Sequence, residues 1–393
     1  MTTARPDDRG REVARVVSVG LDRWAVGWMN RRYLTVALRR RVAADYIVHP
    51  GHPRSLRELG LLPGRRLVND VTVWDLPCWM NPDFASAHGW GWLARGAMRR
   101  YLRPPAAGLQ ALLLWHPGMV RYLDFIPADV AGFYADDLFE GLARDQDDLP
   151  ALRRQQAELL DRADVVFVSW RGLAERLGVA DRATILPHGV EFERYAAAGR
   201  GEYDPPADLP RGRPIVGYTG TVNTKVDLDL LEKLAQRLAD WNVVLVGNKV
   251  FAADALRRRF ERLLERENVF HLGIKGRDEL PAYVQGFDVC MMCYRLTRWT
   301  EFGLPLKLLE YFATGKPVVS TYLPSLEDYA RLLDLCRTHE EFIDAVAARR
   351  DGPDEARRQG RIDLAAANTW DDRAETVLAA FAKAAGDREA SDD

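Results

Sequence analysis

The chain has 393 residues, which is too many for one ordinary hydrophobic core, so its length predicts two domains. With 47% hydrophobic and 28% charged residues, the composition is that of a globular protein and excludes a disordered chain. The formal net charge is −2, no apolar run approaches the roughly 20 residues that span a bilayer, and the charged N-terminus lacks a signal-peptide core. We expect a soluble cytoplasmic protein with no nucleic-acid partner.

Strand-like and helix-like segments alternate along the first half of the chain. Strands are expected at residues 13–20, 46–48, 67–74, 109–115, 130–135, 165–169 and 184–189. A helical stretch over residues 27–41 follows the first of them. Residues 196–213 are rich in glycine, proline and charge without periodicity, which is typical of a linker.

A second alternating series follows this segment. It has expected strands at 214–220, 242–248, 269–273 and 288–294, and expected helices at 226–238, 254–266, 278–285 and 371–385. The pattern predicts an α/β protein with two Rossmann-like domains that face a central cleft. We expect a first domain at 1–195, a linker at 196–213, a second domain at 214–368, a C-terminal helix at 369–386 that packs back toward the first domain, and a disordered tail at 387–393.

The segment from Phe84 to Leu123 is strongly basic and contains no acidic residue. Its arginines are Arg95, Arg99, Arg100, Arg103 and Arg121, and they are accompanied by Trp90, Trp92 and Tyr101. Such a segment suits an anionic membrane surface or a phosphorylated substrate. A solvated helix face with extended arginine side chains explains the same pattern equally well.

The segment from Glu301 to Thr321, EFGLPLKLLEYFATGKPVVST, predicts a helix that begins near Leu304 and ends before Gly315. Lys307 and Glu310 are three residues apart and therefore share one helical face. The loop before the helix would aim backbone N–H groups at an anion, Lys307 would add a positive charge, and Glu310 could accept two hydrogen bonds from a ribose diol. A solvent-exposed Lys–Glu pair is the alternative.

The same segment closely resembles the nucleotide-sugar-binding segment of GT-B glycosyltransferases of family 4, in a bacterial branch with a P-x-K-x-x-E-Y-x-A-x-G-K-P-V-V pattern. Further pieces that resemble this family follow in the expected order, and the resemblance covers residues 109–385. They are LLDRADVVFVSWRGLAERL, ILPHGVEFERY, IVGYTGTVNTKVDLDLLEKLA, NVVLVGN and NTWDDRAETVLAAF. The family implies a GT-B fold and transfer of a sugar from a nucleotide-diphosphate donor.

The resemblance assigns the donor to the second domain. It implies that Glu310 holds the donor ribose, that Lys307 neutralises the departing diphosphate, and that Gly220 and Thr221 form a turn close to that diphosphate. The donor-binding candidates are Gly20, Gly220, Thr221, Asn223, Thr297, Gly303, Leu304, Lys307 and Glu310. The sequence departs from the family at Phe302, where a sugar-binding glutamate is expected, and at Thr221 and Val226, where an arginine and a lysine are usual. These departures leave retention or inversion of configuration open.

In the first domain the resemblance implies that Gly20 allows close approach of the donor and that His116 lies near the transferred sugar. Asp136 and Asp137 follow an expected strand, where catalytic groups concentrate in such folds. Asp137, or with less support Asp136, could be a general base for the acceptor hydroxyl. A helix-capping role fits the pair equally well.

The resulting prediction is a glycosyltransferase that acts in bacterial envelope polysaccharide or glycolipid assembly, with His116, Asp137 and Lys307 as catalytic residues. We expect no metal and no cofactor, a nucleotide sugar as donor, and a saccharide, lipid-linked sugar or small molecule as acceptor. Residues 84–123 could contact the inner membrane face peripherally. The alternatives are a natural-product glycosyltransferase, a sugar-nucleotide epimerase of similar architecture, and a catalytically degenerate partner subunit.

Overall fold

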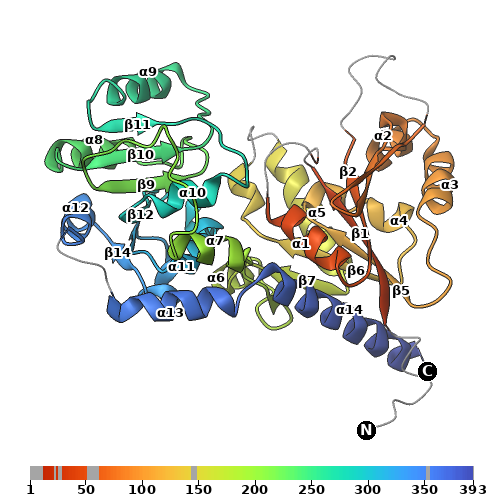
Figure 1. The fold of residues 1–393 in the computed structure, drawn as a ribbon. Coiled ribbons are helices and arrows are strands. Elements are labelled where there is room, and N and C mark those ends of the chain that lie inside the picture. Colours follow the sequence, from red (N-terminus) through yellow and green to blue (C-terminus); the bar gives the residue numbers. More distant parts are fainter. Residues whose placement is uncertain are drawn as a thin grey trace, which may run out of the picture. The chain divides into compact units, whose positions relative to one another are not determined.

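The computed structural model describes residues 12–21, 24, 29–50, 62–142, 148–350 and 355–392 (Figure 1). The chain divides into two compact units. Unit 1 combines Met1–His188 with Trp370–Asp393, and unit 2 is Gly189–Thr369. Each unit is an α/β structure with its own sheet, as the alternating pattern predicted.

Unit 1 contains a sheet of eight strands in the order β3-β4-β2-β1-β5-β6-β7-β8. The strands are β1 (Val13–Gly20), β2 (Ala43–Val48), β3 (Gly64–Val68), β4 (Val71–Asp75), β5 (Leu109–Leu114), β6 (Val130–Ala135), β7 (Val165–Val168) and β8 (Thr184–Ile185). All neighbours pair in parallel except β3 and β4, which form an antiparallel hairpin. The central strands β5 and β6 are apolar and buried along almost their whole length, as expected for a sheet covered on both faces.

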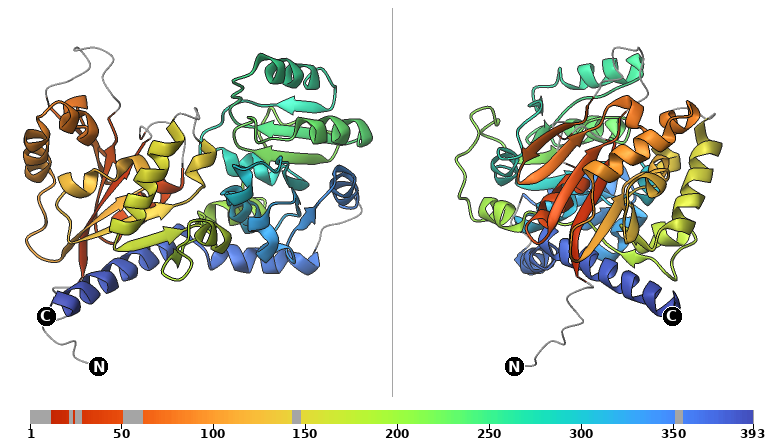
Figure 2. Two further views of the ribbon diagram at one scale, coloured as in Figure 1. Left: turned by 180° about the vertical axis from the view of Figure 1, so that it is seen from behind. Right: turned by 90° about the vertical axis from the view of Figure 1, so that its right-hand side faces the viewer.

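The helices of unit 1 cover this sheet. They are α1 (Asn30–Arg39), α2 (Pro82–Ala87), α3 (Gly91–Tyr101), α4 (Tyr122–Phe125), α5 (Leu149–Arg162), α6 (Arg171–Arg176) and α14 (Trp370–Asp392). The C-terminal helix α14 packs against α1 and against β6, so the expectation that it returns to the first domain is confirmed (Figure 2). Its Phe381 contacts Phe167 edge to face at 5.6 Å and lies over Gly132, where a β-carbon would come within 2.7 Å of the ring.

Unit 2 contains a parallel sheet in the order β11-β10-β9-β12-β13-β14. The strands are β9 (Ile215–Thr219), β10 (Asn242–Val246), β11 (Val269–His271), β12 (Val289–Met292), β13 (Val318–Thr321) and β14 (Asp334–Cys336). The helices are α7 (Phe192–Gly199), α8 (Leu228–Arg237), α9 (Asp254–Leu263), α10 (Leu280–Gln285), α11 (Lys307–Ala313), α12 (His339–Ala347) and α13 (Glu355–Ala366). The strand order reverses between β9 and β12, and ligands of such folds bind at the carboxyl ends of strands beside this switch point.

The expected domain boundaries differ from those of the structure. The chain passes between the units at His188 and Gly189 and again at Thr369 and Trp370, so residues 196–213 are not an interdomain linker. They end α7 and form a surface loop of unit 2, which is held by hydrogen bonds between Tyr203 and Gln285 of α10. The glycine, proline and charge of this segment therefore reflect an exposed loop within one unit.

The expected disordered tail at 387–393 is also wrong for the residues that the structure describes. Helix α14 continues to Asp392. Arg388 donates to the Asp129 carbonyl at 3.3 Å and to the Asp164 carboxylate at 3.1 Å, so this turn of the helix is tied to the end of the unit 1 sheet. These hydrogen bonds stabilise the helix in a segment whose composition alone predicts disorder.

Candidate functional site

Glycines occupy the carboxyl ends of three adjacent strands in unit 2. Gly220 follows β9, Gly247 follows β10, and Gly273 lies just beyond β11, with φ angles of 130°, 145° and 72°. A β-carbon on Gly247 would lie 2.1 Å from the carbonyl oxygen of Gly220. Only glycine combines this backbone conformation with such close packing, so the turns present bare backbone at this edge.

The amine of Lys307 lies beside this backbone. Its Nζ is 3.0 Å from the position that a β-carbon on Gly220 would occupy and 4.0 Å from the ring centroid of Tyr218. The amine donates a hydrogen bond to the hydroxyl of Tyr294. The positive charge is therefore held by an aromatic face and a hydroxyl. Among the described residues no carboxylate forms an ion pair with it, so it is available to an anion.

A buried tyrosine fixes α11 against β9. The Thr219 N–H donates to the Tyr311 hydroxyl at 2.8 Å, and the Thr219 hydroxyl lies 3.1 Å from the same oxygen. Thr219 directly precedes Gly220, and Tyr311 lies one helical turn after Lys307, so this bond places Lys307 beside Gly220. Nothing in the sequence pointed to this contact, because a tyrosine in a buried helix is ordinarily expected to pack among apolar side chains.

Glu310 is largely withdrawn from solvent. Burial raises its pKa to about 7, and the nearby charge of Lys307 and a hydrogen bond from Tyr195 of α7 offset only part of this effect. Both Lys307 and Glu310 are partly buried, so the alternative of a solvent-exposed ion pair is wrong. A carboxyl with this pKa is readily ionised by a ligand that donates hydrogen bonds to it, because such bonds stabilise the ionised form.

The loop before α11 differs from expectation. The helix begins at Lys307 rather than near Leu304, and several N–H groups of the loop are bonded within the protein. Thr297 and Thr300 hydrogen-bond each other's N–H groups through their hydroxyls, and the Glu301 N–H donates to the Thr297 carbonyl. This threonine network closes the loop on itself, which is why these N–H groups do not point outward. Gly303 accepts from Ser325 at 2.7 Å, and Leu304 is buried.

The turn after β9 is shaped by Asn223. Its side-chain oxygen accepts from the Lys225 N–H at 2.9 Å. Thr221, in the same turn, is exposed. The Nζ of Lys225 lies 3.3 Å from the ring centroid of Trp299 in the loop before α11. Val226, where the resemblance to family 4 led us to expect a lysine, is a core residue with 2% exposure. The structure thus brings Lys225, rather than its neighbour, to this edge.

The carboxyl edge of the unit 1 sheet contains His116. Its Nδ1 accepts from the Gly118 N–H at 3.1 Å, which leaves the ring hydrogen on Nε2. Burial, assisted by His49 and the charge of Arg31, lowers the pKa of His116 to about 4. The imidazole is therefore neutral near pH 7 and can donate a hydrogen bond to an oxygen through Nε2.

The two aspartates after β6 are held differently. Asp137 accepts from the N–H of the next residue, Leu138, at 2.9 Å through Oδ1. Asp136 accepts from the Asn30 side chain at 2.5 Å, which links the end of β6 to the start of α1. Asn30 was not anticipated, because its partner lies more than 100 positions along the chain.

Gly20 has a packing explanation. A β-carbon there would lie 1.9 Å from the hydroxyl of Tyr46 and 3.1 Å from Cδ of Arg31. The space that glycine leaves is therefore filled by the protein's own side chains. Within the described residues there is neither a group of three or more His, Cys, Asp or Glu side chains that could hold a metal, nor a helix long and apolar enough to cross a membrane.

Comparison with protein families and curated proteins identifies relatives of this chain. Residues 213–348 match the family described as "Glycosyl transferases group 1". The chain is 26% identical over 239 residues to the "Putative teichuronic acid biosynthesis glycosyltransferase TuaH" of Bacillus subtilis, covering 57% of this chain and 59% of the relative. It is 24% identical over 195 residues to the "Putative colanic acid biosynthesis glycosyl transferase WcaI" of Escherichia coli, covering 48% of this chain and 46% of the relative. The matches span about half the length of these curated relatives.

Solved structures share the fold over nearly the whole chain. One from E. coli, described as "Trehalose-6-phosphate from E. coli bound with UDP-2-fluoro glucose", superposes with a TM-score of 0.69 at 12% identity. The match covers 94% of this chain and 99% of that one. The chain has the GT-B fold and resembles family 4, as the sequence predicted.

Proposed function

We propose, from a GT-B fold that carries a glycosyl transferases group 1 domain over residues 213–348, that this protein transfers a sugar from a nucleotide-diphosphate donor to an acceptor hydroxyl. The single observation that carries the proposal is the position of the Lys307 amine against the bare backbone of Gly220, at the end of a central strand. A diphosphate at this edge would meet a cation without first having to displace a carboxylate.

Unit 2 would hold the donor. Lys307 would stabilise negative charge on the diphosphate as the bond to the sugar breaks, which is the electrostatic form of catalysis. Glu310 would accept hydrogen bonds from the ribose hydroxyls and would ionise as they bind. The turn that contains Asn223 and the exposed Thr221 follows the same strand, β9. The remaining donor-binding candidates lie in the loop before α11: Thr297, Gly303 and Leu304. These assignments need no metal and no cofactor.

Unit 1 would hold the acceptor. His116, neutral and carrying its hydrogen on Nε2, would donate to an oxygen of the transferred sugar or of the acceptor rather than remove a proton. Proton removal would fall to Asp137, which follows β6 and accepts from the Leu138 N–H through Oδ1, or to its neighbour Asp136. Gly20 admits the packing of Tyr46 and Arg31, and its contact with the donor stays a prediction.

The acceptor we propose is a growing or lipid-linked saccharide of a bacterial envelope polysaccharide. The support is that both curated relatives are named for polysaccharide biosynthesis. A lipid-linked acceptor would bring the protein peripherally to the inner membrane face. Incorporation of label from a nucleotide sugar into membrane lipid extracts would support this acceptor, whereas transfer only to small soluble aglycones would favour the natural-product alternative.

The proposal is tested by thermal shift with a panel of nucleoside diphosphates, followed by transfer assays with the matching sugars. A ligand at 100 times its Kd should stabilise the protein by about 2.7 kcal/mol, a readily measured rise in Tm. Release of free nucleoside diphosphate would accompany transfer. Consumption of the sugar nucleotide without that release would indicate an epimerase, and the absence of any shift across the panel would indicate a degenerate partner subunit.

A further inference from the structure

Helix α3 in unit 1 has one buried row of side chains and one exposed face. Ala94 and Met98 point inward and are completely buried. Trp92, Arg95 and Arg99 lie at i, i+3 and i+7 and therefore share the opposite face. Trp92 is 75% exposed and the adjacent Leu93 is 47% exposed. Leu93 and Arg100 are exposed on the side of the helix next to this face. We call the five residues together the α3 face: Trp92, Leu93, Arg95, Arg99 and Arg100.

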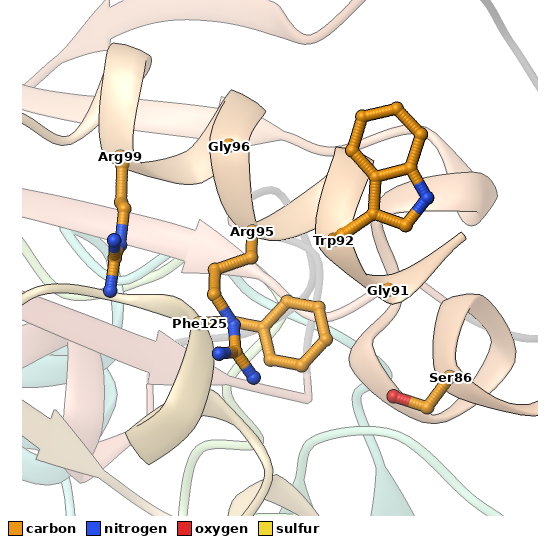
Figure 3. Close-up of a pocket in the computed structure, with 7 residues that line it drawn as sticks. All are labelled: Ser86, Gly91, Trp92, Arg95, Gly96, Arg99 and Phe125. Atoms are coloured by element: carbon orange, nitrogen blue, oxygen red, sulfur yellow. The ribbon is translucent and has the colours of Figure 1, made fainter. Parts of the chain in front are cut away.

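A hollow of about 360 Å³ lies along the α3 face (Figure 3). Its lining residues are Ser86, Gly91, Trp92, Arg95, Gly96, Arg99 and Phe125. Gly96 leaves it open, since a β-carbon there would touch nothing within 4 Å. The Arg95 guanidinium lies 5.4 Å from the centroid of the Phe125 ring. Figure 3 shows the Arg95 and Arg99 side chains extending together, while the Trp92 indole stands apart from them.

The positive charge of the α3 face is not neutralised locally. No acidic residue occurs from Phe84 to Leu123. The two carboxylates that border this segment face other arginines, Asp83 at 3.8 Å from Arg121 and Asp124 at 2.6 Å from Arg162. Within the part of the chain that the structure describes, no carboxylate forms an ion pair with the three arginines of the α3 face.

We infer that the α3 face docks on an anionic lipid bilayer, with lipid phosphates at Arg95, Arg99 and Arg100 and the Trp92 and Leu93 side chains at the headgroup–acyl boundary. Cations alone would suit any soluble anion, but an exposed tryptophan and leucine beside them are unfavourable in water and favourable at a bilayer interface. The inference concerns a surface of unit 1 and does not depend on the transfer reaction.

Co-sedimentation of the full-length protein with vesicles tests the inference. The vesicles would contain about 30% phosphatidylglycerol in phosphatidylcholine, or phosphatidylcholine alone, in about 0.1 M salt. We expect binding to the anionic vesicles only, weakened by added salt. Each arginine replaced should lower the partition coefficient roughly fivefold, so Arg95→Gln, Arg99→Gln and Arg100→Gln together should lower it about 100-fold. Trp92→Ala should lower it severalfold at unchanged charge.

The matched control replaces three exposed arginines elsewhere in unit 1, Arg154→Gln, Arg171→Gln and Arg176→Gln, and should bind vesicles almost as the wild type does. Equal loss in the control, or no binding of the wild type to anionic vesicles, would overturn the inference. So would a Trp92→Ala variant that binds normally while millimolar inorganic phosphate abolishes binding, because that pattern describes a soluble-anion site. If the triple variant of α3 is unfolded by circular dichroism, Trp92→Ala and Arg99→Gln singly give the same decision.

Discussion

The Nζ atom of Lys307 lies 3.0 Å from the point that a β-carbon on Gly220 would occupy. Two segments almost 90 positions apart therefore meet without an intervening side chain, at the carboxyl end of β9. The backbone of Gly220 has a φ of 130°, which side chains rarely adopt. The contact places the Lys307 amine against the partly buried backbone turn at Gly220, and the predictions for unit 2 follow from it.

Gly220→Ala should disrupt the contact between the Lys307 amine and the Gly220 backbone. The added methyl would meet the Lys307 amine and strain the backbone, costing about 1–3 kcal/mol of unfolding free energy and most of the affinity for a nucleotide diphosphate. Gly212→Ala is the control, since Gly212 has a φ of 85° but no atom within 4 Å of the position that its β-carbon would take. Chemical denaturation should show a loss for both variants, and calorimetric titration a loss of binding for Gly220→Ala alone. Normal binding by Gly220→Ala would contradict this role.

Glu310 should make both stability and donor binding depend on pH. Its pKa is raised to about 7 in the folded state, so the folded protein holds a proton that the unfolded chain releases at lower pH. The free energy of unfolding should fall by about 1–3 kcal/mol as pH rises from about 4.5 to 7, and the slope from this group should end above 7. Affinity for a sugar nucleotide should rise through the same window, because ribose hydroxyls favour the ionised carboxylate.

Glu310→Gln should flatten both pH profiles. Urea unfolding and calorimetric titration across the window measure them, with Glu261→Gln, an exposed residue of α9, as the control. A variant at position 310 that keeps the wild-type slopes would show that another group titrates there.

Tyr311→Phe should affect both stability and turnover. It removes the hydroxyl that accepts the buried Thr219 N–H, which should cost about 1–3 kcal/mol. Lys307 would lose its alignment, so kcat should fall more than the KM for the donor rises. Tyr322→Phe, which removes a hydroxyl that bonds Glu327 at the surface, should change neither quantity. Equal kinetics for the two variants would rule out a positioning role for Tyr311.

His116 should act as a neutral hydrogen-bond donor. Its pKa of about 4 predicts that its protonation does not shape the rate profile above about pH 5.5. His116→Ala should lower kcat/KM roughly 10-fold to 1,000-fold through loss of one donor, and His116→Gln should retain part of the rate. The exposed His88→Gln serves as the control. If the rate instead rises with pH with an apparent pKa of 6–7, and this rise is absent in His116→Ala, His116 would be a general base.

Periodicity predicted the main strands and helices because parallel strands buried on both faces are continuous apolar runs, as in β5 and β6. It failed where turns interrupt such a run. Residues 67–74 were expected as one strand, but Asn69 and Asp70 have φ angles of 52° and 61° and form the hairpin turn between β3 and β4. An Asn-Asp pair within a strand-like segment was the available signal.

The site residues divide in the same way. Lys307 and Glu310 were recognisable because their spacing and surroundings are local in sequence. Tyr311, Asn30 and Gly247 were not, because their importance comes from contacts with distant segments: a bond to Thr219, a bond to Asp136, and close approach to the Gly220 carbonyl. The crossing at His188 was hidden for a related reason, since no change of composition marks it.

The most direct test of the account is the transfer rate of Lys307→Ala with a donor identified by the thermal-shift panel. Lys233→Ala, an exposed lysine of α8, is the matched control. We predict that Lys307→Ala keeps the wild-type circular dichroism spectrum and lowers kcat at least 100-fold, since removal of one preorganised electrostatic group costs about 2.7–4 kcal/mol. Transfer by Lys307→Ala within a few-fold of the wild type and the control would contradict the assignment of this amine to the departing diphosphate.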